Sequence, residues 1–320
     1  MTGRPLVSVV TPVYNGAEFI GECIESVLAQ TYENWELVIV ENCSTDGTLE
    51  IARRYEERDP RIRLVTPDVF VGQVENQNRA MNEASPESKY TKVLHADDWM
   101  FPECLERMVE LAEHHPTVGI VGAYRLEETR VTLTGLPHSI SVLSGRELCR
   151  SALLGRPYPY LFGSPSSLLI RSDLVRKRDP FYNVGNLYTN DAEACLETLR
   201  ESDFGFVHQV LTFTRRHEGT VFWAYDRLGG LLPENVKLMK RYAPVYLEQD
   251  EYQRRLAVLL VFYGLFLLRN LHRLPVRDFR AYHLQAARDL KASVDLRDVL
   301  AGVQQQLRRM RKSRPLGFYY

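Results

Sequence analysis

Short apolar runs alternate with amphipathic stretches in the first part of this chain. The apolar runs are rich in β-branched residues and have the length of buried strands: 6–11, 36–40, 62–66, 90–95 and 118–123. The stretches between them repeat apolar residues at helical spacing: 17–30, 45–58, 74–84 and 103–114. This alternation predicts an α/β fold with a mostly parallel, Rossmann-like sheet covered by helices.

The pattern becomes mixed after about residue 131. Ser144 and Glu147 form a capping-box pair that predicts a helix to Leu154. Two further strands and the helix between them are predicted at 165–170, 205–213 and 192–201, and the chain is helical from 228 onward. We therefore predict one domain over 1–225, with halves 1–125 and 126–225, and a helical C-terminal extension over 226–320.

Composition narrows the class of protein. A net charge of -1 and a pI near 6.7 argue against a nucleic-acid binder. The five cysteines are scattered, with no C-x-x-C pair, so a reducing compartment is predicted. The N-terminus lacks the features of a signal peptide. The apolar stretch 256–268 is shorter than the roughly 20 residues of a spanning helix, so a cytoplasmic location is expected.

Two adjacent carboxylates, Asp97 and Asp98, follow the buried run 90–95. Ligands of open α/β sheets bind beyond the carboxyl ends of the strands. A pair of carboxylates there suits a hard divalent cation that holds a diphosphate. The competing interpretation is an acidic loop that caps the helix after Pro102.

Polar turns also follow the first two strands. The first is Thr11-Pro12-Val-Tyr14-Asn-Gly, and the second is Glu41-Asn-Cys-Ser-Thr-Asp-Gly-Thr. Each could be an ordinary turn or helix cap. Because parallel strands bring these turns to the rim that carries Asp97, we expect one pocket for a nucleoside diphosphate, with an aromatic turn against the base and a carboxylate accepting its N–H.

These two turns, with the strands before them, resemble the opening of family 2 glycosyltransferases. The resemblance covers about residues 5–225 and implies an inverting, nucleotide-diphosphate-sugar enzyme of the GT-A fold. It places four residues around the nucleoside: Thr11, Pro12, Tyr14 and Glu41.

The metal motif of that family is Asp-x-Asp, and here it reads His95-Ala-Asp97, followed by Asp98. The resemblance implies Asp97 as the direct ligand of Mn²⁺ or Mg²⁺ and as a nucleotide contact, with Asp98 beside it. His95 stands in place of the first acid, where it either hydrogen-bonds the ribose or simply packs. The family's Ala-Arg-Asn reads Asn-Gln-Asn here, with Arg79 next, so Arg79 is a candidate phosphate or ribose contact.

An inverting transfer needs a carboxylate base for the acceptor hydroxyl. The family places it at the start of a helix in the second half, which matches Asp191, with Glu193 as the fallback. The alternative is a first-turn acid favoured by the helix dipole. Arg216 and His217 lie in the family's closing segment and are candidates for the diphosphate and the metal. The Gln-x-x-Arg-Trp of processive synthases is absent, so transfer of a single sugar is predicted.

The predicted partners are a nucleotide-diphosphate sugar, with UDP as the default, and a glycan or lipid-linked acceptor, but no nucleic acid. The helical extension either docks on the catalytic domain, forms a homodimer or contacts a membrane. The basic run 308–314 suits anionic lipids at the inner face of the membrane, and the alternative interpretation is a solvated charged terminus. The competing function is a non-catalytic nucleotide-sugar or glycan-binding module, because His95 replaces an acid and Asn190 precedes Asp191.

Overall fold

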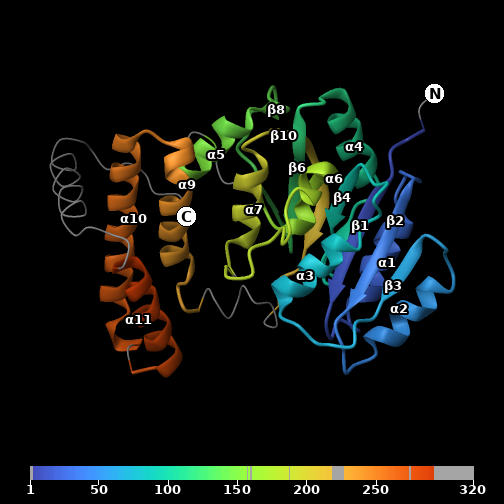
Figure 1. The fold of residues 1–320 in the computed structure, drawn as a ribbon, viewed down its shortest axis with the longest axis horizontal. Helices are drawn as coiled ribbons and strands as arrows, with labels where there is room; N and C mark the ends of the chain where they lie inside the picture. The colour runs from blue at the N-terminus through green and yellow to red at the C-terminus, as the bar shows by residue number, and fades with distance from the viewer. Residues whose placement is uncertain are drawn as a thin grey trace. The chain divides into compact units, whose positions relative to one another are not determined.

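The computed structural model describes residues 3–156, 158, 161–186, 188–217, 227–273 and 275–291. The chain divides into two compact units, Met1–Arg216 and His217–Tyr320. The first unit holds a ten-stranded sheet with the central order β3-β2-β1-β4-β9-β6-β10-β5 (Figure 1). The predicted boundary near residue 225 lies outside the described residues and stays a prediction.

The longer strands of the sheet run in one direction. They are β1 (Val7–Val13), β2 (Trp35–Glu41), β3 (Ile62–Val65), β4 (Tyr90–Val93), β6 (Val118–Glu127) and β10 (Asp203–Thr214). β1 pairs in parallel with both β2 and β4, and β6 pairs in parallel with β10. Because the chain leaves β1 toward β2 and returns to its other side with β4, the rim beyond these strands is a topological switch point.

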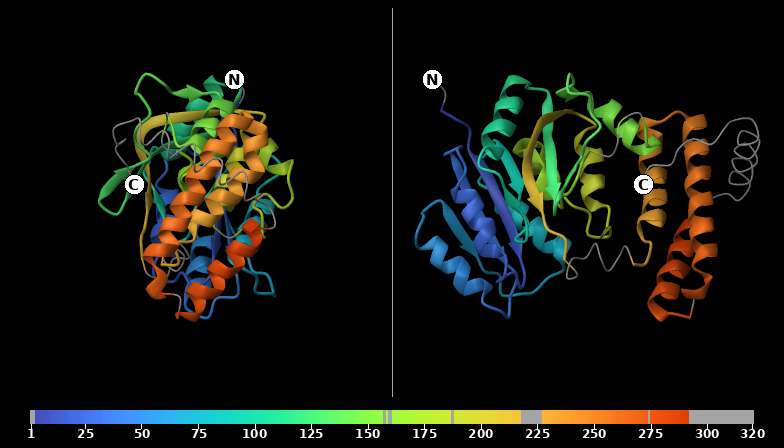
Figure 2. Two further views of the ribbon diagram at one scale, coloured as in Figure 1. Left: turned by 90° about the vertical axis from the view of Figure 1, so that its left-hand side faces the viewer. Right: turned by 180° about the vertical axis from the view of Figure 1, so that it is seen from behind.

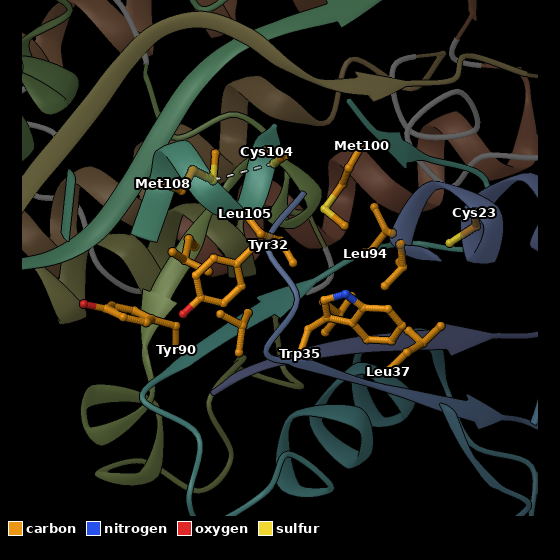
Figure 3. Close-up of a cluster of buried hydrophobic side chains, with 14 of the residues drawn as sticks. Cys23, Tyr32, Trp35, Leu37, Tyr90, Leu94, Met100, Cys104, Leu105 and Met108 are labelled. Atoms are coloured by element: carbon orange, nitrogen blue, oxygen red, sulfur yellow. Dashed lines mark hydrogen bonds between the residues drawn. The ribbon is translucent and has the colours of Figure 1, made fainter. Parts of the chain in front are cut away.

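Helices cover this sheet on both faces. One face packs on α1 (Ile20–Leu28) and α4 (Cys104–His114), whose apolar stripes join residues such as Trp35, Leu37, Tyr90 and Leu94 in one buried cluster (Figure 3). α2 (Thr48–Glu56) packs beside β3, and α3 (Gln73–Asn82) packs against β1 and β2. The remaining helices are α5 (Gly145–Leu154), α6 (Ser172–Arg176) and α7 (Asn190–Thr198). The predicted α/β architecture is confirmed.

The segment 165–170, predicted as one strand, divides into two elements. Pro165–Ser167 forms the 3-10 turn η1, and only β9 (Leu169–Arg171) extends, antiparallel to β4 and β6. Proline at the first position sets a helical φ and favours the turn. Short strands that the pattern did not predict are β5 (Trp99–Met100), β7 (Arg130–Thr132) and β8 (Val142–Leu143), which pair at the sheet's margins.

The second unit is helical, as predicted. It contains α9 (Leu231–Tyr246), α10 (Gln249–Arg269), the turn η2 (Leu271–Arg273) and α11 (Arg277–Lys291). α11 folds back beside the end of α10, where Tyr263 Oη and His283 Nδ1 are 2.9 Å apart (Figure 2). The apolar stretch 256–268 lies within α10, and none of the described helices is long and apolar enough to cross a membrane.

Candidate active site

The turns after β1 and β2 are tied to each other at the rim of the sheet. Val13 and Glu41, the last residues of the two strands, are register partners. Asn15 N–H donates to Ser44 Oγ at 2.8 Å, and Thr45 N–H donates back to Asn15 Oδ1 at 2.8 Å. Asn15 has a φ of 50°, a left-handed conformation that asparagine tolerates better than most residues. The two turns therefore form one surface.

The turn after β4 meets the same surface. A Cβ placed on Gly16 would lie 3.5 Å from Ala96 Cβ, an ordinary contact distance, so the two turns are neighbours. The same Cβ would lie 2.7 Å from Val13 Cγ2, so glycine suits this position of the first turn. Cys23 Sγ lies 3.6 Å from the carbonyl oxygen of His95. The three segments that sequence reasoning assigned to one rim are thus in contact.

Two exposed aromatic rings stand beside this surface. Tyr14 is 48% exposed and meets the ring of Phe70, which is 55% exposed, edge to face at 4.8 Å. Exposed aromatic rings offer stacking area to a planar base. Pro12 is half-buried, whereas the Thr11 side chain is fully buried within β1. A nucleoside at this surface would therefore meet Pro12 and Tyr14 rather than the buried hydroxyl group of Thr11.

The loop that carries Phe70 is fixed by two polar side chains. Asn42 donates to the Val71 carbonyl at 2.8 Å and accepts from the Val71 N–H at 3.1 Å. Arg79 donates to the Val69 carbonyl at 2.8 Å. The interaction that the structure gives Arg79 is thus with a neighbouring loop, and its predicted contact with phosphate or ribose stays a prediction. Asn42 has a positioning role that the sequence analysis did not assign.

Glu41 is buried at the end of β2 and bonds its own turn. Its carboxylate accepts the N–H groups of Cys43 at 3.2 Å and Ser44 at 2.5 Å. These bonds stabilise the turn, in which Cys43 has a φ of 59°. A carboxylate has about four lone-pair sites, so Glu41 keeps capacity for one more donor such as a base N–H.

The two carboxylates of the metal motif differ in environment. Asp98 is 3% exposed and accepts the Arg215 N–H at 3.1 Å, while Asp97 is partly exposed. Burial, followed by the charge of Asp97, raises the pKa of Asp98 to about 7, against the opposing effects of Ser166 and the Arg215 N–H. Asp98 is therefore the inner carboxylate and Asp97 the one more open to a ligand.

A divalent cation fits this arrangement only if the substrate supplies some of its ligands. In the parts of the chain described, no group of three histidine, cysteine or acidic side chains is placed to hold a metal. Mg²⁺ and similar hard cations commonly bind one or two carboxylates, waters and substrate phosphates. Asp97 offers such oxygen atoms at the rim. The predicted ligand His217 is the first residue of the second unit, and its part in this site stays a prediction.

His95 connects the metal motif with the second half of the domain. Its backbone N–H donates to Ser166 Oγ at 3.1 Å, and its Nε2 lies 3.3 Å from Gln77 Oε1. Burial lowers the pKa of His95, although the carboxylates of Asp97 and Asp191 oppose this effect. The ring is therefore neutral near pH 7, and it lies in the electrostatic field of both predicted functional acids.

Asp191 lies in the first turn of α7. Burial raises its pKa to about 6, opposed by the hydrogen bond from Ala192 N–H, at 2.7 Å, and by the charges of His95 and Arg125. A carboxylate with a pKa near neutrality suits a general base, since it is ionised at working pH yet accepts a proton readily. The neighbouring acid, Glu193, is buried and accepts from Asn183 Nδ2 at 3.1 Å and Asn186 Nδ2 at 3.0 Å. Glu193 thus holds the loop before α7.

Two cationic side chains near these acids, one buried and one partly buried, escaped the sequence analysis. Lys92 is fully buried in β4 and donates to the carbonyl groups of Ser166, at 2.8 Å, and Leu168. Arg125 in β6 donates to Glu127 at 2.8 Å. Its positive charge partly opposes the burial that raises the pKa values of Asp98 and Asp191. Each interrupts or ends an apolar strand run, the same signal that identified Asp97.

Arg216 ends the first unit in an ion pair with Glu127, and its backbone N–H donates to Glu128 at 2.6 Å. The neighbouring Arg215 donates to the Asp97 carbonyl at 3.2 Å and pairs with Glu22. Arg215 thus contacts the metal motif, while the predicted diphosphate role of Arg216 stays a prediction.

Comparison with known proteins agrees with this fold. The family description "Glycosyl transferase family 2" matches residues 8–178. The putative glycosyltransferase EpsE of Bacillus subtilis is 30% identical over 75% of this chain and 89% of its own length. The putative teichuronic acid biosynthesis glycosyltransferase TuaG of the same organism is 31% identical over 48% of this chain, a match that spans 60% of TuaG.

Solved structures share the fold at low sequence identity. S. aureus TarS in complex with UDP-GlcNAc superimposes with a TM-score of 0.65 and 18% identity, over 91% of this chain and 82% of that chain. The mannosyltransferase PcManGT from Pyrobaculum calidifontis, in complex with GDP-Man and Mn²⁺, gives a TM-score of 0.52 and 19% identity, over 96% and 88%. The predicted family and enzyme class are confirmed: the chain belongs to glycosyl transferase family 2.

Proposed function

We propose that this protein is a metal-dependent, inverting glycosyltransferase that moves one sugar from a nucleotide-diphosphate sugar to a hydroxyl group of a glycan or lipid-linked acceptor. The main support is the placement of Asp191. Its carboxylate, with a pKa of about 6, interacts electrostatically with the ring of His95 in the metal motif, although the two residues lie far apart in sequence. This placement supports a proposed base and a proposed nucleotide-binding rim in one region.

The donor would bind along the rim. Tyr14 and Phe70 would face the base, and Glu41 would accept from its N–H. The complexes of TarS with UDP-GlcNAc and of PcManGT with GDP-Man support a nucleotide-sugar donor of this kind. Uracil remains the default base and UDP the default nucleotide, since a carboxylate acceptor suits an imide N–H.

Asp97 would hold a divalent cation, Mn²⁺ or Mg²⁺, which when bound neutralises diphosphate charge. Lys92 would hold the segment at Ser166 against the metal motif, because it donates to the Ser166 carbonyl while Ser166 Oγ accepts the His95 N–H. Arg125 would add positive charge near the leaving group, because its field already reaches both Asp98 and Asp191.

Asp191 would take the proton of the acceptor hydroxyl. The acceptor oxygen then forms a bond to the anomeric carbon on the face opposite the diphosphate, while the bond from that carbon to the phosphate oxygen breaks. The nucleoside diphosphate leaves with the bonding electrons, and the configuration inverts. His95, held neutral, would hydrogen-bond the ribose or donor sugar through its ring.

The acceptor and location follow the nature of the relatives. EpsE and TuaG carry glycosyltransferase descriptions, and that of TuaG refers to teichuronic acid biosynthesis, which supports a glycan acceptor. We therefore propose a cytoplasmic enzyme that works at the inner face of the membrane. The basic run 308–314, which favoured this location in the sequence, lies outside the described residues.

Isothermal titration with UDP, with and without Mn²⁺, tests the donor site. We expect binding that Mn²⁺ strengthens, and that Asp97→Asn weakens only when Mn²⁺ is present. Asp173→Asn, a change to an exposed acid in α6 away from the rim, is the matched control. If UDP and GDP both fail to bind in either condition, the proposed function is wrong. Free nucleotide released from a panel of donors, with and without membrane extract as acceptor, separates catalysis from simple binding.

A further inference from the structure

The outer surface of the α10–α11 hairpin carries a cluster of exposed aliphatic side chains. Of the ten large hydrophobic residues that are exposed in the described parts of the chain, five belong to this hairpin. They are 43–63% exposed: Leu265, Leu268, Leu271, Val276 and Leu284. Four of them lie within residues 265–273 and 275–280, which we call the hairpin tip. Such clusters mark interaction surfaces, whereas single exposed leucines do not.

This exposure is not a sign of poor packing, because the hairpin has its own core. Along α11, Phe279, His283, Ala286 and Leu290 are buried at helical spacing. The rings of Phe266 and Phe279 pack at 6.3 Å between the two helices. The inner face of the hairpin is therefore complete, and the leucines of the tip belong to its outer face.

Cationic side chains accompany the exposed leucines. Arg269, Arg277 and Arg280 are exposed, and within the described residues none of the three forms an ion pair with a carboxylate. Arg277, Arg280 and Leu284 have the i, i+3, i+7 spacing of one helical stripe. Asp278 is the acidic residue of the tip. The tip thus combines exposed aliphatic area with a net positive charge.

We propose that the hairpin tip binds the surface of an anionic lipid membrane. Leucine side chains would enter the boundary between headgroups and acyl chains, and the guanidinium groups would contact lipid phosphates. A symmetric contact between two copies of this chain would place the same surface on both partners, so arginines would oppose arginines. The charge of the tip therefore favours a negatively charged partner over a second copy.

Sedimentation of the full chain with lipid vesicles tests this proposal. We expect binding to vesicles of phosphatidylcholine and phosphatidylglycerol in equal parts, and little binding to phosphatidylcholine alone. Replacing Arg269, Arg277 and Arg280 together by Gln should weaken the binding about 100-fold. Leu268→Gln with Leu271→Gln should weaken it about tenfold or more.

A matched control changes the same charge elsewhere. Arg53, Arg54 and Arg58 are exposed on or just after α2 of the first unit, and their joint replacement by Gln should leave vesicle binding within about twofold of the parent chain. UDP affinity should be unchanged in all variants, which shows that they are folded and separates this proposal from the proposed enzymatic function. If the tip variants bind anionic vesicles as tightly as the parent chain, the proposal is overturned. This holds also where the basic run 308–314 accounts for the vesicle binding.

A second measurement reports on the tip directly. Leu271→Trp should give a blue shift of tryptophan emission with anionic vesicles, relative to the parent chain, because the indole would enter a less polar region. The absence of any shift would contradict insertion of the tip. A dimer that forms in analytical ultracentrifugation and is abolished by the leucine variant would also overturn the proposal, since the tip would then be a subunit interface.

Discussion

Replacing Asp191 by Asn should remove activity and at the same time stabilise the fold. In the free protein, burial raises the pKa of this carboxyl to about 6 from a usual 3.8. Its ionised form is thus penalised in the folded state by about 1–3 kcal/mol, where the lower figures allow for the partial exposure of the side chain. Asn carries no charge and retains an oxygen for the Ala192 N–H.

The sign of this effect depends on pH. Above the folded pKa of about 6, Asp191 is ionised in both states, and the full penalty reduces the stability of the parent protein. Below the usual value of 3.8 the carboxyl is protonated in both states, and the penalty disappears. The Asn variant should therefore be more stable by about 1–3 kcal/mol well above pH 6, with the difference vanishing as the pH falls.

Urea unfolding and steady-state kinetics over a range of pH measure the two effects. We expect kcat/KM of the parent enzyme to decline in acid with an apparent pKa of about 6, and turnover of the variant to be lower by about 10²–10⁴-fold. Asp173→Asn is the control of opposite sign, since a hydrogen bond from Arg171 lowers the pKa of Asp173. Unchanged turnover in the Asp191 variant would exclude this residue as the base, and reduced stability would refute the electrostatic reasoning.

Three other substitutions probe the neighbours of Asp191. Lys92→Met should change the free energy of unfolding by less than about 2 kcal/mol, because an unfavourable buried charge and its hydrogen bonds are lost together. The same variant should bind UDP about tenfold more weakly in calorimetry with Mn²⁺ present. Equal affinity would mean that Lys92 does not organise the metal motif. Glu193→Gln should cost about 1–2 kcal/mol in urea unfolding; a loss of turnover equal to that of Asp191→Asn, at unchanged stability, would make Glu193 the base instead. His95→Asp should lower turnover because it adds a carboxylate beside Asp97 and Asp98. Adding Gln77→Arg should restore turnover, with a coupling of about 1–3 kcal/mol between positions 95 and 77 in a double-mutant cycle. Additive losses would contradict the contact between His95 and Gln77.

The convergence of the three turns could be predicted from sequence because it follows from strand direction alone. Once β1, β2 and β4 are parallel neighbours, Tyr14, Glu41 and Asp97 must leave the sheet at the same edge. Helix positions were equally accessible, since apolar spacing defines the buried stripes of α1 and α4. These inferences need only periodicity and the direction of the strands.

Side-chain partners could not be predicted in the same way. Lys92 binds carbonyl groups more than seventy residues away, and the ion pair of Arg216 with Glu127 spans a similar distance. Glu41 has the position expected of a base-binding acid, yet its carboxylate also closes its own turn. Such contacts depend on tertiary packing, about which a single sequence contains no signal beyond the presence of a polar residue in an apolar run.

The fold shifts the pKa values of the surface ion pairs and of the rim groups in opposite senses. In the surface pairs of Arg61 with Asp59 and Arg171 with Asp173, the arginine lowers the pKa of the acid, so the fold favours both charges. At the rim the fold opposes charge: the pKa values of Asp98 and Asp191 are raised, and burial lowers those of His95 and Lys92. Groups that contributed only to stability would be better replaced by apolar residues of similar size. We propose that a bound ligand compensates these charges at the rim, as a cation and a diphosphate would.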